Sequence, residues 1–258
     1  MPVIHPTAIV DSRAELAADV EVGPYSIIGP DVVIGAGTRI ASHVVIKGPT
    51  RIGTNNRIFQ FSSVGEDCQD KKYNGEPTRL EIGNDNVIRE SVTIHRGTVQ
   101  DDGLTKIGDG NLFMVGVHVA HDCKIGSNNI FANTCGIAGH VHVGDNVILG
   151  GMTGVHQFCR ISSYSMASGC SLIVKDVPAY VMVGGNPAAA HGMNFEGMRR
   201  RGWTQETIGK LRKAYKIVFR EGLTLENALV ELDAMVAECP ELGIFIDSLR
   251  TSTRGITR

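Results

Sequence analysis

The sequence has few of the residues that usually fill a large globular core. Phe, Trp and Tyr make up only 5% of its 258 residues, whereas there are 31 Gly. Large aromatic side chains contribute much of the buried area in ordinary domains of this size. Their scarcity, together with abundant glycine, indicates a repetitive architecture of tight turns and aliphatic side chains.

Three further features that the sequence lacks argue against other classes of protein. The six Cys form no Cys-x-x-Cys pair, which argues against a disulfide framework and a cysteine-based zinc site. No window approaches the roughly 20 apolar residues of a membrane-spanning helix, and no basic segment followed by an apolar run opens the chain. We therefore expect a soluble, unexported, cytoplasmic protein with reduced thiols and no integral membrane association.

The sequence also lacks an excess of charge of either sign. Its 25 Lys and Arg are balanced by 27 Asp and Glu, a formal net charge of −2. Because no overall basic field would attract a polyanion, we expect no nucleic-acid partner. An acidic protein partner would have to bind a local basic patch.

The most informative pattern present is an aliphatic residue at every sixth position. From Ile4 to Val64 the series contains eleven aliphatic residues without a miss, and it resumes in phase at positions 82, 88 and 94. After a second interruption the phase shifts by one and runs from Ile107 to Ile173, with Ala167 its only small member.

A period of six fits one short flat side of a β-helix, and it fits neither an amphipathic helix nor a hairpin. Glycine often follows the aliphatic residue, as expected for a strand that ends in a tight corner. Three sides make a coil of about 18 residues, so residue i+18 lies over residue i at about 4.8 Å. We predict a mainly β fold, a parallel β-helix of hexapeptide repeats over residues 1–190.

Helical spacing replaces the repeat from about Pro187. One amphipathic run follows Thr204, a candidate N-cap, and a second follows Thr224 and ends before Pro240. We predict a C-terminal α-helical domain over residues 191–258, packed on the β-helix as a cap or on a neighbouring subunit. The two interruptions, near 66–81 and 96–106, are predicted to be external loops.

Six of the nine His lie between residues 95 and 156. The 18-residue stacking places Gly139 over His121 and His140 over Asp122, with Gln157 one coil beyond Gly139. A His beside a carboxylate and facing a glycine backbone can act as a general base next to an N–H that receives an oxyanion. The alternative is a set of solvated His on the flat faces, which their clustering disfavours.

A metal site is another interpretation of this cluster. His118, His121 and His140 could supply three nitrogen ligands to zinc, as in carbonic anhydrases built from such repeats, where three His lie between adjacent subunits. Those enzymes use one His followed by two that are five residues apart, whereas the spacings here are three and nineteen. We therefore expect no metal.

Two polar segments are candidates for ligand binding. Residues 67–77 are polar and turn-rich, and a loop that leaves a rigid repeat often carries binding residues, although a solvated insertion explains it equally well. The basic triplet Arg199–Arg201 has the guanidinium geometry that suits phosphate, although such triplets are more often solvated.

A series of motifs resembles the UDP-N-acetylglucosamine 3-O-acyltransferases, hexapeptide-repeat enzymes that begin lipid A biosynthesis in Gram-negative bacteria. The matching segments are Ile94–Thr98, Ala120–Cys123, Ala138–Val141, Gly151–Thr153, Val155–Phe158, Lys175–Pro178 and Asn194–Gly202. The resemblance covers essentially the whole chain. It implies a left-handed β-helix, an exception to the usual right-handed crossover.

The resemblance also implies a reaction. An (R)-3-hydroxyacyl group would pass from acyl carrier protein to the 3-hydroxyl of UDP-N-acetylglucosamine, without a cofactor, in a homotrimer with sites between subunits. By motif, His121 is the general base, Asp122 its partner, and the Gly139 amide stabilises the oxyanion. The residues implied to hold the nucleotide sugar are Asp70, Lys72, His118, His140, Asn194, Glu196, Arg200 and Arg201. His156 and Gln157 would lie along the acyl or pantetheine path.

The same family measures acyl length with a groove that ends at Gly where longer chains are accepted and at a bulky residue where they are cut short. The matching position here is Gly169, 48 residues beyond His121. By the repeat geometry this is on the order of 13 Å along the axis, which predicts a preference for about twelve to fourteen carbons.

Two rival functions fit the sequence less well. The N-acyltransferase of the same pathway carries a uridine-binding domain before its repeats, whereas here the repeat begins at Ile4. A non-catalytic scaffold or ice-binding protein needs regular Thr or Asn arrays on a flat face. This chain lacks a Thr ladder and has the clustered His.

Overall fold

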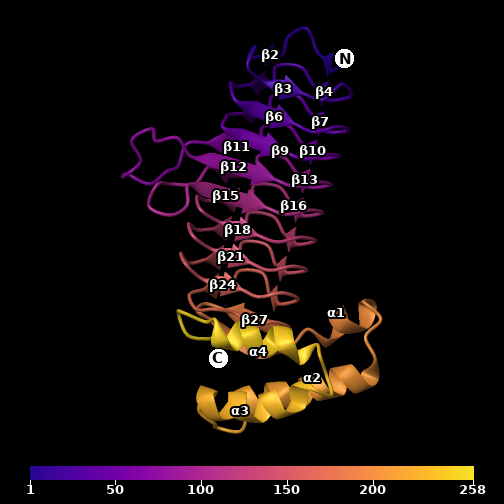
Figure 1. Ribbon diagram of the computed structural model, residues 1–258, viewed down its shortest axis with the longest axis vertical. Helices are drawn as coiled ribbons and strands as arrows, with labels where there is room; N and C mark the ends of the chain where they lie inside the picture. The colour runs from indigo at the N-terminus through magenta and orange to yellow at the C-terminus, as the bar shows by residue number, and fades with distance from the viewer.

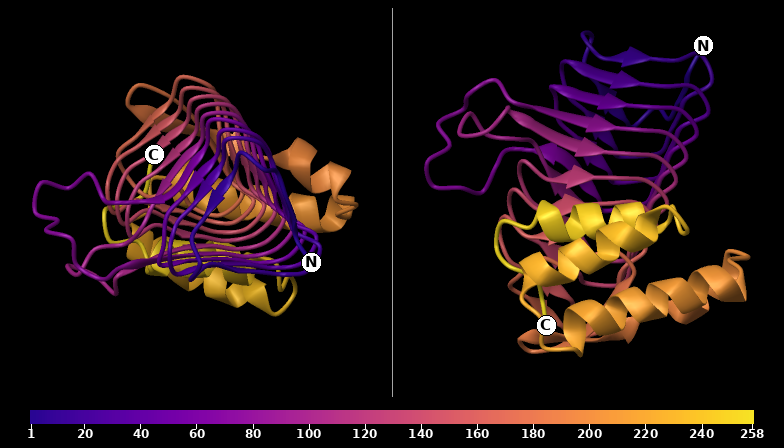
Figure 2. Two further views of the ribbon diagram at one scale, coloured as in Figure 1. Left: turned by 90° about the horizontal axis from the view of Figure 1, so that it is seen from above. Right: turned by 60° about the horizontal axis from the view of Figure 1, so that its bottom comes forward.

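The computed structural model describes all 258 residues and consists of a three-sided parallel β-helix, a β-hairpin and four helices (Figure 1). Its short strands stack into sheets of 11, 9 and 8 strands, which we call sheets A, B and C. Viewed along the axis, the coils form a triangle (Figure 2). The parallel β-helix predicted from the six-residue period is confirmed.

Each sheet takes one strand from each complete coil, and sheet A ends in an additional antiparallel hairpin. Sheet A contains β1 (Val3–Ile4), β4 (Glu21–Val22), β7 (Arg39–Ile40), β10 (Arg57–Ile58), β13 (Val87–Ile88), β16 (Leu112–Phe113), β19 (Ile130–Phe131), β22 (Ile148–Leu149), β25 (Met166–Ala167), β27 (Val181–Gly185) and β28 (Ala188–Met193). Sheet B contains β2 (Ile9–Val10), β5 (Ile27–Ile28), β8 (Val45–Ile46), β11 (Ser63–Glu66), β14 (Thr93–His95), β17 (His118–Val119), β20 (Gly136–Ile137), β23 (Gly154–Val155) and β26 (Leu172–Ile173). Sheet C contains β3 (Glu15–Leu16), β6 (Val32–Ile34), β9 (Thr50–Ile52), β12 (Arg79–Ile82), β15 (Leu104–Ile107), β18 (Lys124–Ile125), β21 (His142–Val143) and β24 (Arg160–Ile161).

The register between coils follows the expected 18-residue step. Val119 pairs with Ile137, and Ile137 pairs with Val155. Across the first interruption Val64 pairs with Ile94, so the added residues leave the stacking intact. Residues one coil apart therefore lie over each other wherever no loop intervenes.

The aliphatic series fills the interior, except at its beginning. Every member from Val22 to Ile173 is buried, and burial of such a side chain contributes roughly 1.5–3 kcal/mol. Ile4 is exposed, and Val10 and Leu16 are only half-buried. The first coil has a neighbour on one side only, which explains why its residues remain accessible.

A column of buried amides supports one corner of the triangle. Asn86 donates to the side-chain oxygen of Asn56 (3.1 Å) and to the carbonyl of Gly108 (3.0 Å). Its own side-chain oxygen accepts from the backbone and side chain of Asn111 (both 2.9 Å). Because each Asn also donates to the Asn of the coil before it, the column is a continuous hydrogen-bonded network.

Both external loops leave the corner between sheets B and C, at residues 67–78 and 96–103. They are shorter than the predicted interruptions because the flanking residues extend β11, β12 and β15. The buried Arg96 joins them, donating to the carbonyl of Gly65 and the hydroxyl of Tyr73 (3.1 Å) and pairing with Asp67. The first loop is therefore fixed by the start of the second.

The helices lie at the C-terminal end of the β-helix (Figure 1). They are α1 (Phe195–Arg200), α2 (Gln205–Phe219), α3 (Leu225–Val236) and α4 (Leu242–Arg250). Thr204 caps α2 as predicted, accepting from Thr207 N, and Thr224, from which the second run was predicted to start, caps α3 by accepting from Asn227 N. None of the helices has both the length and the apolar content needed to span a bilayer.

The sequence pattern did not predict α1, α4 or the antiparallel β27–β28 hairpin. Helix α1 has six residues and buries only Met198, and α4 begins without a side-chain cap. Helix α4 and the β-helix are held together by the Tyr180 hydroxyl, which donates to the carbonyl of Glu241 (2.9 Å), and by the Ser248 hydroxyl, which accepts from Ala179 N (3.0 Å).

We predict that Asn86→Ala lowers the free energy of unfolding by about 2 kcal/mol, since it leaves the buried backbone N–H of Asn111 without an acceptor and removes the bonds that the Asn86 side chain donates to Asn56 and Gly108. Denaturant unfolding followed by circular dichroism measures the change. Arg57→Ala, on the exposed side of the same corner, is the control and should change stability by less than about 0.5 kcal/mol. Equal stability of the two variants would contradict a structural role for the amide column.

Candidate active site

His121 and Asp122 lie in the turn between β17 and β18, at the corner that also carries the two loops. Asp122 has a left-handed backbone (φ 58°) and is fully buried, and His121 is 7% exposed. Nδ1 of His121 lies 2.8 Å from Oδ2 of Asp122. The carboxylate therefore orients the imidazole and leaves Nε2 free.

Gly139 lies directly over this ring, as the stacking predicts. A Cβ at residue 139 would lie 2.6 Å from Nε2 of His121, so only glycine allows the ring and the backbone to approach this closely. The Gly139 N–H donates no hydrogen bond within the chain, whereas its carbonyl accepts from Phe158 N (3.2 Å). A free donor thus lies beside a free imidazole nitrogen.

The second loop holds the carboxylate of Asp122. The backbone N–H of Thr98 donates to Oδ1 (2.8 Å) and its hydroxyl donates to Oδ2 (2.6 Å), while Asp122 N donates to the hydroxyl of Thr105 (2.8 Å). Burial by itself would raise the pKa of Asp122, but the hydrogen bonds from His121 and Thr98 outweigh it and hold the pKa below its ordinary value. Asp122 is therefore ionised at neutral pH.

His140 stands at right angles to His121, with ring centroids 5.0 Å apart, and stacks flat on Phe158 at 4.5 Å. Its Nδ1 contacts Asp101 Oδ2 (3.0 Å), and its Nε2 lies 3.8 Å from Asp122 Oδ2. The predicted stacking of His140 over Asp122 is confirmed. Both ring nitrogens of His140 thus face a carboxylate, but only Nδ1 is within hydrogen-bonding distance.

Two more histidines extend this group into the β-helix wall. Nδ1 of His118 lies 2.7 Å from the hydroxyl of Thr93, and its ring meets His95 edge-on at 4.9 Å. Burial, followed by the neighbouring His118, lowers the pKa of His95 to about 4, and burial together with His121 lowers the pKa of His118. Both rings are therefore uncharged at neutral pH.

A cavity of about 470 Å³ opens against this corner. Among the residues singled out in the sequence, Asp70, His118, His121, Gly139 and Gln157 line it. Asp70 and its neighbours enter from the first loop, which Arg96 holds in place.

Two predicted residues adjoin this cavity without lining it. Lys71 lines the wall where Lys72 was expected, and Lys72 N donates to Asp70 Oδ1 (3.0 Å). His156 is exposed, with Nδ1 3.2 Å from the carbonyl of Gln157.

The remaining nucleotide-sugar candidates lie elsewhere in the chain. Asn194 caps α1, and Glu196 pairs with Arg200 (3.3 Å) along the same helix. Arg201 reaches Asn146 (3.5 Å) and the ring of Tyr164, which belong to the corner between sheets C and A. Figure 2 shows α1 on the opposite side of the triangle from the loops. One chain therefore does not bring these residues to His121.

Gly169 also lies at another corner. It follows β25 in the turn between sheets A and B, whereas His121 lies in a turn between sheets B and C. It is exposed, and a Cβ there would lie 3.3 Å from the carbonyl of Gly151. The distance estimated along the helix axis did not include the separation between these two corners. A single chain therefore cannot form one groove from His121 to Gly169.

The three His of the zinc interpretation do not form one cluster. The donor atoms that lie within 4.8 Å of one another belong to His121, Asp122 and His140, and His118 is outside this group. Asp122 already accepts from Thr98 and His121. Within one chain the three His therefore do not converge on one point.

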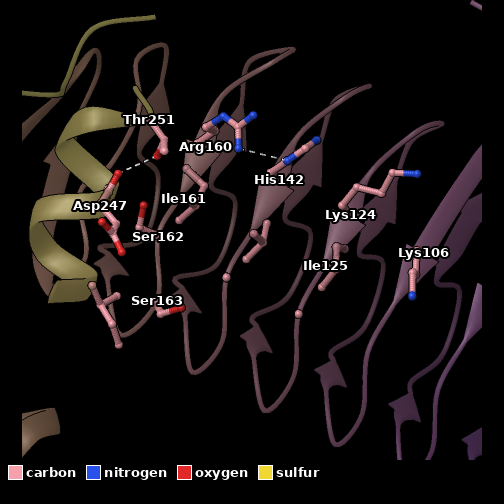
Figure 3. Close-up of a pocket in the computed structure, with 15 residues that line it drawn as sticks. Lys106, Lys124, Ile125, His142, Arg160, Ile161, Ser162, Ser163, Asp247 and Thr251 are labelled. Atoms are coloured by element: carbon pink, nitrogen blue, oxygen red, sulfur yellow. Dashed lines mark hydrogen bonds between the residues drawn. The ribbon is translucent and has the colours of Figure 1, made fainter. Parts of the chain in front are cut away.

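A second cavity, of about 460 Å³, lies between the outer face of sheet C and α4 (Figure 3). Its wall carries Lys106, Lys124, His142 and Arg160, one from each successive coil, and Arg160 donates to Nδ1 of His142 (3.3 Å). None of the site residues singled out in the sequence lines this cavity.

Comparison with known proteins places the chain in a family. Residues 176–257 match the model described as UDP N-acetylglucosamine O-acyltransferase, domain 2, and residues 104–139 match the bacterial transferase hexapeptide model. A curated relative, the acyl-[acyl-carrier-protein]–UDP-N-acetylglucosamine O-acyltransferase of Stutzerimonas stutzeri, is 63% identical over all 258 residues and the whole of both chains. The chain belongs to the acyl-[acyl-carrier-protein]–UDP-N-acetylglucosamine O-acyltransferase family.

Solved structures of this O-acyltransferase family have the same fold as this chain. The structure of LpxA from Acinetobacter baumannii is 61% identical, with a TM-score of 0.98 over 99% of this chain and 100% of that one. The Arabidopsis UDP-N-acetylglucosamine acyltransferase is 38% identical, with a TM-score of 0.86 over 99% and 100% of the two chains. The predicted left-handed β-helix with its C-terminal helical region is confirmed, and the chain is an O-acyltransferase by family.

Several residues that shape this O-acyltransferase site were not singled out in the sequence. Thr98, Asp101 and Phe158 contact Asp122 or His140, and Arg96 fixes the first loop. Thr98 and Phe158 lie within the motifs that resemble the family, and this was the sequence signal that could have identified them. Asp101 lies inside the second interruption, where the 18-residue step gives no position.

Proposed function

We propose that this protein transfers an (R)-3-hydroxyacyl group from acyl carrier protein to the 3-hydroxyl of UDP-N-acetylglucosamine, the first step of lipid A biosynthesis, in the cytoplasm. The observation that carries the proposal is the contact of His121 with Gly139 at the wall of a cavity, with Asp122 behind the ring. The names of the relatives supply the two substrates.

In the proposed mechanism, Nε2 of His121 takes the proton from the 3-hydroxyl as its oxygen attacks the thioester carbonyl. Asp122 holds Nδ1 protonated and stabilises the imidazolium that forms. The Gly139 N–H receives the oxyanion of the tetrahedral intermediate. Collapse of the intermediate breaks the carbon–sulfur bond, and the proton on His121 passes to the departing thiolate of the carrier protein. No covalent intermediate with the protein is needed.

We propose that a neighbouring subunit completes the site in a homotrimer. The support is that Asn194, Glu196, Arg200 and Arg201 lie in α1 or at its two caps, away from the cavity with His121. In this proposal they bind the uridine and phosphates of the nucleotide sugar, and Asp70, Lys72, His118 and His140 bind the rest.

The outer face of sheet B is suited to such a contact. Ile9, Ile27 and Leu172 are exposed on it, and the outward positions at Gly136 and Gly154 carry no side chain. If three such faces packed around an axis, the corner with His121 on one subunit would meet the corner with Gly169 on the next. Apolar area buried in this way stabilises oligomers.

This arrangement restores the proposed acyl ruler. The acyl chain would run from His121, past Gln157 and His156, toward Gly169 of the neighbouring subunit. A glycine there leaves room for a chain of about twelve to fourteen carbons, given a rise of about 4.8 Å per coil.

We expect His121→Ala to lower kcat by about 10² to 10⁴ with little change in the KM for UDP-N-acetylglucosamine, because general-base catalysis contributes factors of this size. The assay combines purified protein, UDP-N-acetylglucosamine and hydroxyacyl carrier protein and detects the 3-O-ester. His5→Ala, in the first coil, is the matched control and should retain full activity. Undiminished turnover by His121→Ala would overturn the mechanism.

Co-expression of two inactive variants tests the shared site. One chain carries His121→Ala, and the other carries Arg200→Ala with Arg201→Ala. In randomly mixed trimers about one quarter of the sites would combine an intact His121 with intact arginines of its neighbour, so about a quarter of the activity should return. No recovery in verified mixed trimers would mean that each site belongs to one chain.

Gly169→Met should move the preference toward shorter acyl chains, because its side chain would occupy the far end of the groove. Competition among ten-, twelve- and fourteen-carbon hydroxyacyl carrier proteins measures the shift. Gly209→Met, on the exposed face of α2, is the matched control and should leave the preference unchanged. A ten-carbon preference in the unsubstituted protein would refute the ruler.

A further inference from the structure

The second external loop, residues 96–103, has no role in the proposed mechanism, yet it touches both neighbours of His121. At its start, Thr98 donates two hydrogen bonds to Asp122. At its tip, Asp101 contacts His140. One loop therefore orients the carboxylate behind the base and the imidazole beside it.

The side chain of Asp101 is itself oriented by the loop. Its Oδ1 accepts from Asp102 N (3.0 Å), and its backbone N–H donates to the carbonyl of Thr98 (3.2 Å). Gly103, with a left-handed backbone (φ 70°), closes the turn by donating to the same carbonyl (3.1 Å). With Oδ1 occupied in the turn, Oδ2 is directed to Nδ1 of His140 (3.0 Å).

Only Asp101 makes a hydrogen bond to the ring of His140. Phe158 stacks on one face of the ring and His121 meets it edge-on, so these contacts restrict the ring plane but not the choice of protonated nitrogen. The Nε2 atom has no partner within hydrogen-bonding distance, since Asp122 Oδ2 is 3.8 Å away. A carboxylate on Nδ1 keeps a proton on that nitrogen and fixes the rotation of the ring.

We propose that Asp101 is a positioning residue that fixes the orientation of the His140 ring, with Nδ1 turned to the loop, so that His140 binds the sugar of the nucleotide substrate. The inference rests on the proposed function, which assigns His140 to sugar binding. Asp101 touches no reacting atom and acts only through His140.

The neighbouring Asp102 separates this role from simple anchoring of the loop. Both carboxylate oxygens of Asp102 lie 2.8 Å from Nζ of Lys124, which also donates to the carbonyl of Leu104 (2.6 Å). Asp102 thus ties the loop to sheet C without touching the histidines. Asp102→Ala is therefore a matched control, with the same substitution one residue away.

The experiment compares four variants of the full-length protein: Asp101→Ala, Asp102→Ala, His140→Ala and the double variant with both Asp101→Ala and His140→Ala. Asp101→Ala should raise the KM for UDP-N-acetylglucosamine about five- to tenfold, as expected for loss of a charge-assisted hydrogen bond. Its kcat and its KM for hydroxyacyl carrier protein should change less than about twofold, as should all constants of Asp102→Ala. In the His140→Ala background, Asp101→Ala should have no further effect.

Calorimetric titration with UDP-N-acetylglucosamine supplies a second readout. Asp101→Ala should weaken binding by the same factor as it raises KM. Equal losses in both Asp variants, or an undiminished Asp101→Ala effect in the His140→Ala background, would mean that the residue only anchors the loop. If the unsubstituted protein turns over and Asp101→Ala matches it, this inference alone fails. If the unsubstituted protein neither binds nor acylates the nucleotide sugar, the proposed function fails and the inference with it.

Discussion

The hydrogen-bonded stacking of each coil on the next is the constraint on which the rest of the structure depends. Strands of only two residues could not form a stable sheet alone, but each pairs in parallel with the coils on both sides. The stacking keeps the aliphatic residues inside and the corner residues in columns. Side chains that are 18 residues apart are thereby brought into contact, as His121 is with Gly139.

The two external loops are fixed to this rigid stack of coils. Both leave the corner that carries His121, and buried groups rather than surface contacts hold them there: Arg96 holds the first loop, and Asp122 accepts from the start of the second. Residues whose positions must be accurate, such as Asp122, belong to the coils. Residues that close around a ligand, such as Asp70, belong to the loops.

Much of the fold could be predicted from the sequence because the period is counted directly. The register, the buried series and the caps Thr204 and Thr224 followed from spacing and from side chains that accept from helix N–H groups. Helix α1 could not be predicted in this way, because six mostly polar residues carry no amphipathic signal.

The candidate site was predictable where the 18-residue step applies and not beyond it. The contacts of His121 with Asp122 and Gly139 follow from the step and from adjacency in the chain. The contact of Asp101 with His140 joins residues 39 apart across a loop, for which the step gives no rule. The position of Gly169 shows a related limit, since a distance along the axis does not say which corner a residue occupies.

Residues with a left-handed backbone conformation form a column at one corner of the β-helix. Asp122, His140 and Phe158 occupy the same corner position in three successive coils, each with φ between 58° and 66°. The backbone conformation sets the direction of every side chain in that column, whatever the residue type. Changing one member alters the chemistry at a fixed point, and functional groups along the column can be separated only by whole coils. Side chains therefore recur along the column at a fixed spacing of one coil, and any ligand bound along it must match that spacing.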